Sequence, residues 1–297
     1  MRSGTETITE SLKRQDVTRT CTDKAIEFIE HHQDTPFFFY LAHPLPHTPL
    51  AASSEFKGTS QAGLYGDVIE EIDYHTGRLL KKVKELGLDN NTYIIFTSDN
   101  GPWLFKGKQA GKAHPLRSGK TSTYDGGLRV PCIIRAPGKV PAGTTCDLVT
   151  ATIDLMPTIV KLAGGMTPQD RTIDGLDLSQ VLLGHQHTLD RHFYFYQHRS
   201  LRAVRKGQWK LHLPHSDLDK TNEGSLWRSH VPKGDRGFIT EYTLYNLDDD
   251  IGETVNVASG HSEVVRELRQ LLGYAQQDIG SHNMIGDNSR QTPTKDH

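Results

Sequence analysis

Residues 94–103 read IIFTSDNGPW, an apolar run that changes abruptly into Asp99 and Asn100 and is then broken by Gly101 and Pro102. The apolar part predicts a strand that is buried on both faces. A carboxylate and an amide side by side before Gly-Pro form a good turn without any ligand. The same two side chains can also supply the hard oxygen atoms that Ca²⁺ or Mg²⁺ prefers. The pair alone favours the turn, so the choice between turn and metal site depends on the rest of the chain.

A strand–helix–strand unit surrounds this stretch. Residues 36–43, PFFFYLAH, form a continuous apolar run that predicts another buried strand. Between the two runs, apolar residues recur at helical spacing from Leu64 to Leu86, and Gly87 follows, so we expect a long amphipathic helix that ends there. A strand, a helix and a strand in succession predict a parallel pair within an α/β sheet. In such sheets, ligands bind beyond the carboxyl ends of the strands, where the acid–amide pair lies.

Two regions that differ in the length and pattern of their apolar segments follow one another along the chain. The first, residues 1–190, carries the long apolar elements and is predicted to be the main α/β domain, a mostly parallel sheet flanked by helices. Beyond it, the apolar segments are short and alternating, with a Lys-Gly turn between two of them, as is typical of a small antiparallel sheet. Residues 262–278 predict a final amphipathic helix. We therefore assign residues 191–297 to a small C-terminal subdomain.

The overall composition argues against several classes of protein. The 297 residues include 34 Lys and Arg and 36 Asp and Glu, a formal net charge of -2 that does not favour nucleic acid as a partner. The longest apolar run, FFFYLA, is too short to span a bilayer. Cys21, Cys132 and Cys146 form neither a disulfide framework nor a metal-binding pattern. The polar N-terminus shows no signal peptide, which leaves the compartment open.

Two further segments carry side chains suited to an anionic ligand. The loop PLRSGKTSTYDGG, residues 115–127, contains Arg117 and Lys120, which could hold an anion bound to a metal at the acid–amide pair. Its Gly-Lys-Thr lacks the spacing of a P-loop. His43 and His47 have the spacing of zinc ligands on a helix, but two prolines lie between them, so we do not expect a shared helix face.

Five segments, in this order along the chain, together resemble the sulfatase family of the arylsulfatase type, within the alkaline-phosphatase-like superfamily. They are PFFFYLAHPLPHTPL, YGDVIEEIDYHTGRLLKKVKELGLDNNTYIIFTSDNG, PLRSGKTSTYDGGLRVPCIIRAPG, IDLMPTIVKLAG and LYNLDDDIGETVNVA. Agreement of several long motifs in one order is not expected by chance. The resemblance implies an alkaline-phosphatase-like α/β fold and the hydrolysis of sulfate esters at a calcium site.

The resemblance also implies roles for individual residues. Asp99 and Asn100 match the family's pair of calcium ligands, which bind one divalent cation. Lys120 matches the lysine that contacts the sulfate, and His47 matches the histidine near the ester oxygen, so both are expected to bind substrate and to take part in catalysis. His43 matches no family position. The expected partner is a sulfated small molecule or glycan.

The segment that would supply the family's nucleophile is not found in this chain. Sulfatases attack sulfur with a hydrated formylglycine, made from the cysteine of a Cys-x-Pro-Ser-Arg or Cys-x-Ala-Ser-Arg segment, and none of the three cysteines here lies in one. The family's N-terminal Asp pair and Lys-x-His segment are also missing. We therefore expect a C-terminal portion of a sulfatase, with a partial calcium ligand set and no turnover of its own, which a missing N-terminal half would complete.

Two other functions stay open. A hydrolase of the same superfamily could act on phosphate or phosphonate esters, although the PLRSGKTSTYDGG segment favours a sulfatase. A protein that kept the fold could also bind a ligand without catalysis. Members of the sulfatase family are often periplasmic, secreted or lysosomal.

Overall fold

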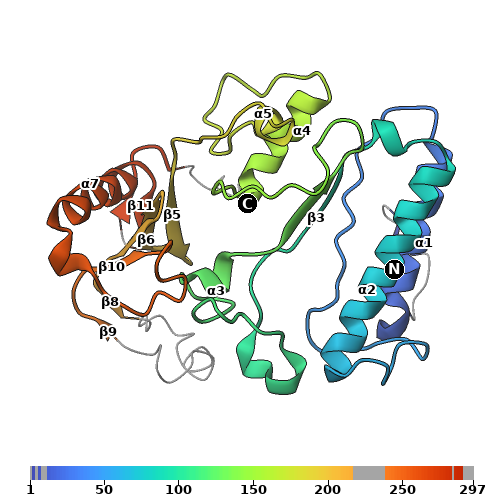
Figure 1. Ribbon diagram of the computed structural model, residues 1–297, viewed down its shortest axis with the longest axis horizontal. Helices are drawn as coiled ribbons and strands as arrows, with labels where there is room; N and C mark the ends of the chain where they lie inside the picture. The colour runs from blue at the N-terminus through green and yellow to red at the C-terminus, as the bar shows by residue number, and fades with distance from the viewer. Residues whose placement is uncertain (1, 4–5, 8–11, 217–237, 283, 290–297) are drawn as a thin grey trace, which may run out of the picture.

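The molecule is elongated, with a pair of helices at one end and a sheet covered by a helix at the other (Figure 1). The computed structural model describes residues 2–3, 6–7, 12–216, 238–282 and 284–289. The α-helices are α1 (Val17–His31), α2 (Gly63–Glu85), α3 (Asp125–Leu128), α4 (Leu155–Leu162), α5 (Ser179–Leu182) and α7 (Ser262–Asp278). The 3-10 helices are η1 (Arg14–Asp16), η2 (Asp89–Asn91), η3 (Leu104–Gln109), η4 (Thr152–Asp154) and η6 (Ala258–Gly260).

The strands fall into one larger sheet and several short pairs. The longer strands are β3 (Ile94–Thr97), β4 (Cys132–Arg135), β5 (His192–Gln197), β6 (Ser200–Lys206), β7 (Trp209–His212) and β10 (Thr243–Asn246). The two-residue strands are β1 (Arg2–Ser3), β2 (Glu6–Thr7), β8 (His215–Ser216), β9 (Phe238–Ile239), β11 (Gly280–Ser281) and β12 (Met284–Ile285).

The two long helices, α1 and α2, pack side by side at one end of the molecule (Figure 1). Helix α2 buries Val68, Ile72 and Val83 along one stripe, as its apolar spacing predicts. It ends just before Gly87, whose φ of +71° is costly for any residue with a side chain. The predicted long helix is therefore confirmed.

Strand β3, the first part of the opening stretch, pairs with β4 in an antiparallel ladder. Ile95 lies opposite Ile134, and Phe96 lies opposite Ile133. All strand pairs among the described residues are antiparallel. The α/β class is confirmed, but the predicted parallel pairing of residues 36–43 with β3 is not formed in this part of the chain.

Residues 36–43 run as extended chain and form no strand, contrary to the prediction. The rings of Phe37 and Phe39 face α1 and lie 5.9 and 4.9 Å from the ring of Phe28. Phe38 and Tyr40 alternate with them and are 66% and 80% exposed. The prediction of burial on both faces is wrong here because the described residues cover only one face of the run.

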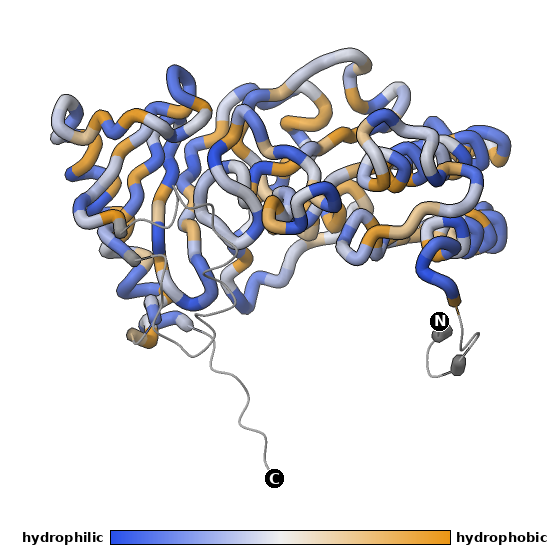
Figure 2. Tube along the Cα trace, turned by 90° about the horizontal axis from the view of Figure 1, so that it is seen from below, coloured by the Kyte–Doolittle hydropathy of each residue, from blue (hydrophilic) through white to orange (hydrophobic). Residues whose placement is uncertain are grey.

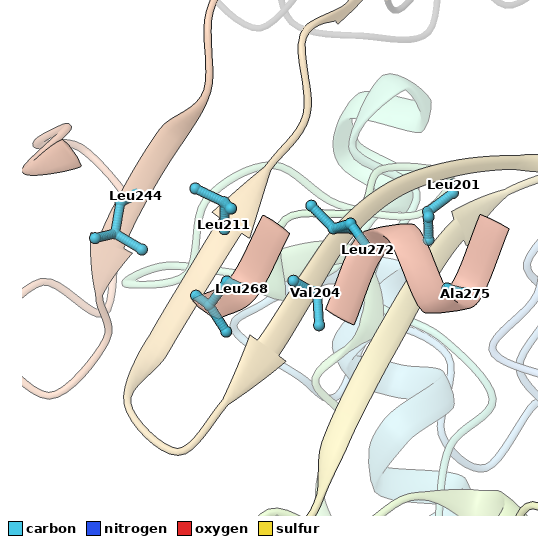
Figure 3. Close-up of a cluster of buried hydrophobic side chains, with 7 residues drawn as sticks. All are labelled: Leu201, Val204, Leu211, Leu244, Leu268, Leu272 and Ala275. Atoms are coloured by element: carbon cyan, nitrogen blue, oxygen red, sulfur yellow. The ribbon is translucent and has the colours of Figure 1, made fainter. Parts of the chain in front are cut away.

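The C-terminal sheet has the order β10-β7-β6-β5 and is antiparallel throughout, as the alternating sequence predicts. Helix α7 packs across it, and its bounds match the prediction. Figure 3 shows the core that the sheet and helix share: Leu201, Val204, Leu211, Leu244, Leu268, Leu272 and Ala275. Burying each leucine contributes on the order of 2 kcal/mol.

Apolar segments are spread over the whole length of the molecule rather than gathered at one end (Figure 2). Accordingly, a second buried cluster around Val68 and Ile72 lies at the end with the long helices, apart from the C-terminal core. Among the described residues, no helix combines the length and the apolarity needed to cross a bilayer.

Candidate active site

Two backbone hydrogen bonds join the end of β3 to the segment that carries Lys120, which we call the Lys120 segment (residues 117–127). The amide of Lys120 donates to the carbonyl of Pro102 at 2.9 Å. The amide of Gly101 donates to the carbonyl of Gly127 at 3.0 Å. The sequence-predicted acid–amide pair and the predicted lysine therefore lie on neighbouring, hydrogen-bonded segments, although about 20 residues of chain separate them.

Glycine is required where these two segments meet. A Cβ atom on Gly101 would lie 1.8 Å from the carbonyl oxygen of Gly126. A Cβ atom on Gly119 would lie 2.4 Å from the carbonyl oxygen of Pro102. Both obstacles are backbone atoms, which cannot move aside as a side chain can. The glycines beside Asn100 and Lys120 thus explain how these residues come close together.

Asp99 and Asn100 follow β3 with one residue, Ser98, in between. The Asp99 side chain is exposed, and Asn100 is half-buried. The Asn100 amide nitrogen donates to the Gly101 carbonyl at 3.1 Å, so the amide oxygen is the atom that Asn100 can offer to a ligand. Two oxygen donors fit a calcium site in kind, but Ca²⁺ takes six to eight. No cluster of three or more His, Cys, Asp or Glu suited to a metal ion occurs among the residues that the structure describes.

Trp103 brings the two predicted catalytic side chains to one place. The His47 and Trp103 ring centroids are 5.9 Å apart. The Lys120 Nζ atom lies 5.6 Å from the centroid of the same indole, and the Lys106 Nζ atom lies 4.3 Å from it. An indole face attracts cations, which favours this arrangement of the lysines. Trp103 is not among the site residues predicted from the sequence; its place three residues after Asn100, beyond Gly101 and Pro102, is the available signal.

The loop that carries His47 is fastened on both sides. The Nη2 atom of Arg14 donates to the His47 carbonyl at 2.7 Å. On the α2 side, the buried Glu71 carboxylate accepts the Ser53 amide at 2.9 Å, and Asp67 accepts the Gly58 amide at 2.8 Å. These backbone bonds hold the carboxyl group of Asp67 charged and lower its pKa.

The His47 ring has one nitrogen committed to the protein. Its Nδ1 atom lies 2.8 Å from the carbonyl oxygen of Thr48. Because a carbonyl oxygen only accepts, we assign the proton to Nδ1, which leaves Nε2 as the basic nitrogen. The imidazole can therefore exchange a proton with a ligand through Nε2.

Arg117, the second cation that the sequence suggests for an anion, contacts other parts of the protein. Its guanidinium lies 3.9 Å from the Tyr124 ring centroid, and its Nη1 atom donates to the Glu253 carbonyl at 2.7 Å. These contacts tie Arg117 to the C-terminal part of the chain. The anion-binding role of Arg117 stays a prediction, and Lys120 is the cation of this segment that lies beside Trp103.

Comparison with known proteins places this arrangement in a family. The family model described as Sulfatase matches residues 5–166, and the model described as the C-terminal region of aryl-sulfatase matches residues 188–295. The model for the C-terminal region of N-sulphoglucosamine sulphohydrolase also matches residues 118–217. The chain belongs to the sulfatase family.

Individual relatives agree with this assignment. The chain is 35% identical over 276 residues to an N-acetylgalactosamine-6-sulfatase of Canis lupus familiaris, covering 88% of this chain and 52% of the relative. It is 38% identical over 260 residues to the steryl-sulfatase of Homo sapiens, covering 82% and 45%. A solved structure from work on glycosaminoglycan metabolism by Bacteroides thetaiotaomicron superposes with a TM-score of 0.75 at 32% identity, covering 88% of this chain and 55% of that one.

The alkaline-phosphatase-like fold expected from the sequence is thereby confirmed. The chain spans about half the length of the curated relatives that it matches. Statements about the activity of a whole protein therefore belong to the proposal that follows.

Proposed function

We propose that the end of β3, the Lys120 segment and the His47 loop form part of a site that hydrolyses sulfate esters. One arrangement carries the proposal. The Lys120 amide donates a hydrogen bond to the carbonyl of Pro102, two residues beyond Asn100. The side chains of Lys120 and His47 both lie next to the Trp103 ring. A sulfate ester needs cationic groups around its oxygen atoms and a proton for its leaving oxygen. Lys120 and His47 are suited to these two tasks.

Within this proposal, each residue has a separate task. The Lys120 ammonium attracts the sulfate oxygens and orients the ester. The Nε2 atom of His47 exchanges a proton with the ester oxygen, since Nδ1 is held by the Thr48 carbonyl. Trp103 contacts both side chains and thereby helps to position them.

Asp99 and Asn100 would hold a calcium ion as part of a larger ligand set. Their carboxylate and amide oxygens are of the kind that Ca²⁺ prefers, and they lie at the edge of the site next to the backbone that bonds Lys120. When bound, the ion would offset negative charge on the sulfate oxygens. With two of at least six donors, the affinity of the chain alone should be low.

The 297-residue chain alone should not turn over sulfate esters. The nucleophile of the family is a formylglycine, and none of the three cysteines lies in the segment from which it is made. Activity is accordingly expected of a protein that joins this chain to a formylglycine-bearing N-terminal half. The substrate would be a sulfated glycan or a sulfated small molecule, since relatives named for an amino sugar sulfate and for a steryl sulfate are similarly close.

The test is hydrolysis of an aryl sulfate and of an aryl phosphate by protein made from the complete open reading frame. We expect preference for the sulfate, loss of activity with a calcium chelator, and a loss of at least about a hundredfold in kcat/KM for Lys120→Ala. Lys81→Ala, which changes an exposed lysine on α2, is the control. Preference for the phosphate, or full activity of Lys120→Ala, would overturn the proposal.

A further inference from the structure

A buried cluster of charged residues lies between the C-terminal sheet and the Lys120 segment. Lys210 on β7 and Glu253, after β10, are both 0% exposed, and Asp125 at the start of α3 is 3% exposed. The Lys210 Nζ atom lies 2.8 Å from the Asp125 carboxylate and 2.9 Å from the Glu253 carboxylate. Such a cluster is costly to desolvate, so its burial is weak evidence of a stabilising role.

Glu253 accepts hydrogen bonds from the Lys120 segment at two separated positions. Its carbonyl oxygen accepts the Arg117 Nη1 atom at 2.7 Å. Its carboxylate accepts the Asp125 amide at 2.7 Å. The amide of Gly126 donates to the Arg117 carbonyl at 2.9 Å and closes the segment into a loop. Lys120 lies between these two positions.

The loop between these two positions contains residues with unfavourable backbone φ angles. Ser118 and Thr121, on either side of Lys120, have φ angles of +63° and +80°, and Glu253 itself has a φ of +51°. Each left-handed residue other than glycine costs on the order of 1 kcal/mol, and such residues persist only where their surroundings impose them. Outside contacts therefore hold the loop: those of Glu253 at its two ends, and that of Gln197, whose Nε2 atom donates to the Thr121 carbonyl at 3.0 Å.

The charge of Glu253 is secured by its neighbours. Burial alone would raise the pKa of this carboxyl group, but Lys210 and His212 outweigh burial and lower the pKa to about 2. The His212 Nε2 atom lies 3.4 Å from the same carboxylate. Glu253 is thus a full acceptor for the Asp125 amide at any pH at which the protein would work.

We propose that Glu253 is a positioning residue, which fixes the Lys120 segment so that the Lys120 ammonium faces the sulfate of the substrate. The C-terminal sheet contributes Lys210 and thereby supports the site without touching substrate. We call the two hydrogen bonds from Arg117 and from the Asp125 amide to Glu253 the clamp. The task of Lys120 rests on the proposed function, but the clamp itself is tested on the 297-residue chain alone.

The first measurement is amide hydrogen exchange of the 297-residue chain. In Glu253→Gln, the Lys120 and Gly126 amides should exchange about tenfold faster than in the wild type, while amides of α1 should stay unchanged. Glu263→Gln, which alters an exposed acid on α7, is the matched control and should change neither. Uniform acceleration of core amides, or no acceleration at Lys120, would overturn the clamp, because a merely structural residue affects all core amides together.

A second variant guards against misfolding of the first. Arg117→Gln removes the contact to the Glu253 carbonyl together with the guanidinium contacts to the Tyr124 ring and the Tyr245 hydroxyl, and it leaves Lys210, Asp125 and Glu253 in place. It should accelerate the same two amides by a smaller factor. Unchanged exchange in this folded variant would count against the clamp.

The second measurement separates the clamp from the proposed function. In protein from the complete open reading frame, Glu253→Gln should lower kcat/KM for an aryl sulfate about tenfold at a temperature where circular dichroism shows it folded. Full activity of this variant would overturn the positioning role. If the wild type does not hydrolyse aryl sulfate while the exchange result holds, the proposed function fails and the clamp stands.

Discussion

Gly101 is the residue at which the end of β3 comes closest to the Lys120 segment. We predict that Gly101→Ala lowers the free energy of unfolding by about 2 kcal/mol or more, because the new methyl group meets the Gly126 carbonyl. Gly77→Ala is the matched control: it lies within α2, its Cβ would meet nothing within 4 Å, and it should stabilise by up to about 1 kcal/mol. Urea unfolding of both variants tests this, and equal stabilities would contradict the packing described.

His212 supplies a pH dependence that can be measured. Burial lowers its pKa to about 4, against an ordinary value of 6.5. The unfolded chain therefore binds a proton that the folded chain refuses, and stability falls as the pH drops from about 6.5 to about 4. The upper limit of this loss is on the order of 3 kcal/mol. Glu253, with its pKa lowered to about 2, adds a further loss below about pH 4.5.

Urea midpoints at pH 7 and pH 4.5 check the prediction for His212. The wild type should lose more stability between these pH values than His212→Asn, whose side chain does not titrate. Comparing the loss of stability in the two proteins separates His212 from the other histidines whose pKa is lowered by burial, half-buried His43 and buried His75. Equal losses in both proteins would contradict a neutral, buried His212.

At the scale of elements, the extended run 36–43 presents two unlike faces. Phe39→Ser should lower the free energy of unfolding by about 1–2 kcal/mol, since this ring packs on Phe28. Phe38→Ser, one residue away and 66% exposed, should change stability by less than about 0.5 kcal/mol and raise the solubility of the chain. Thermal unfolding and the soluble fraction after expression test the pair, and a larger destabilisation from Phe38→Ser would contradict the described orientation.

The elements that sequence predicts best here are those with local periodicity. Helices α2 and α7 and the C-terminal antiparallel sheet follow from the spacing of apolar residues, because such patterns reflect which face is buried. A continuous apolar run, in contrast, does not say which neighbours will cover it. That is why residues 36–43 were predicted as a paired strand and are not one among the described residues.

In the candidate site, too, the sequence predicts some features and not others. The resemblance of motifs predicted Asp99, Asn100 and Lys120, and the structure brings their segments together. It could not predict the clamp, since Lys210 and Asp125 are 85 positions apart, and Asp125 and Glu253 are 128 apart. No local pattern in sequence marks a lysine that will be buried between two acids.

At the scale of the whole molecule, the C-terminal region and the proposed site form one unit. The C-terminal sheet carries its own apolar core, yet Lys210 and the nearby Glu253 meet Asp125 within the Lys120 segment. Removal of the C-terminal region should therefore affect the site as well as the fold. This connection gives the C-terminal region a role in positioning the proposed site. The chain itself spans about half the length of its relatives.

The most direct measurement of the central claim uses terbium as a luminescent substitute for calcium. Tb³⁺ bound at Asp99 and Asn100 should be sensitised by nearby Trp103, and inorganic sulfate should tighten its binding through Lys120. We predict that Asp99→Ala removes the luminescence and that Lys120→Ala removes the effect of sulfate. Unchanged luminescence in Asp99→Ala, or an unchanged effect of sulfate in Lys120→Ala, would contradict a shared cation and sulfate site.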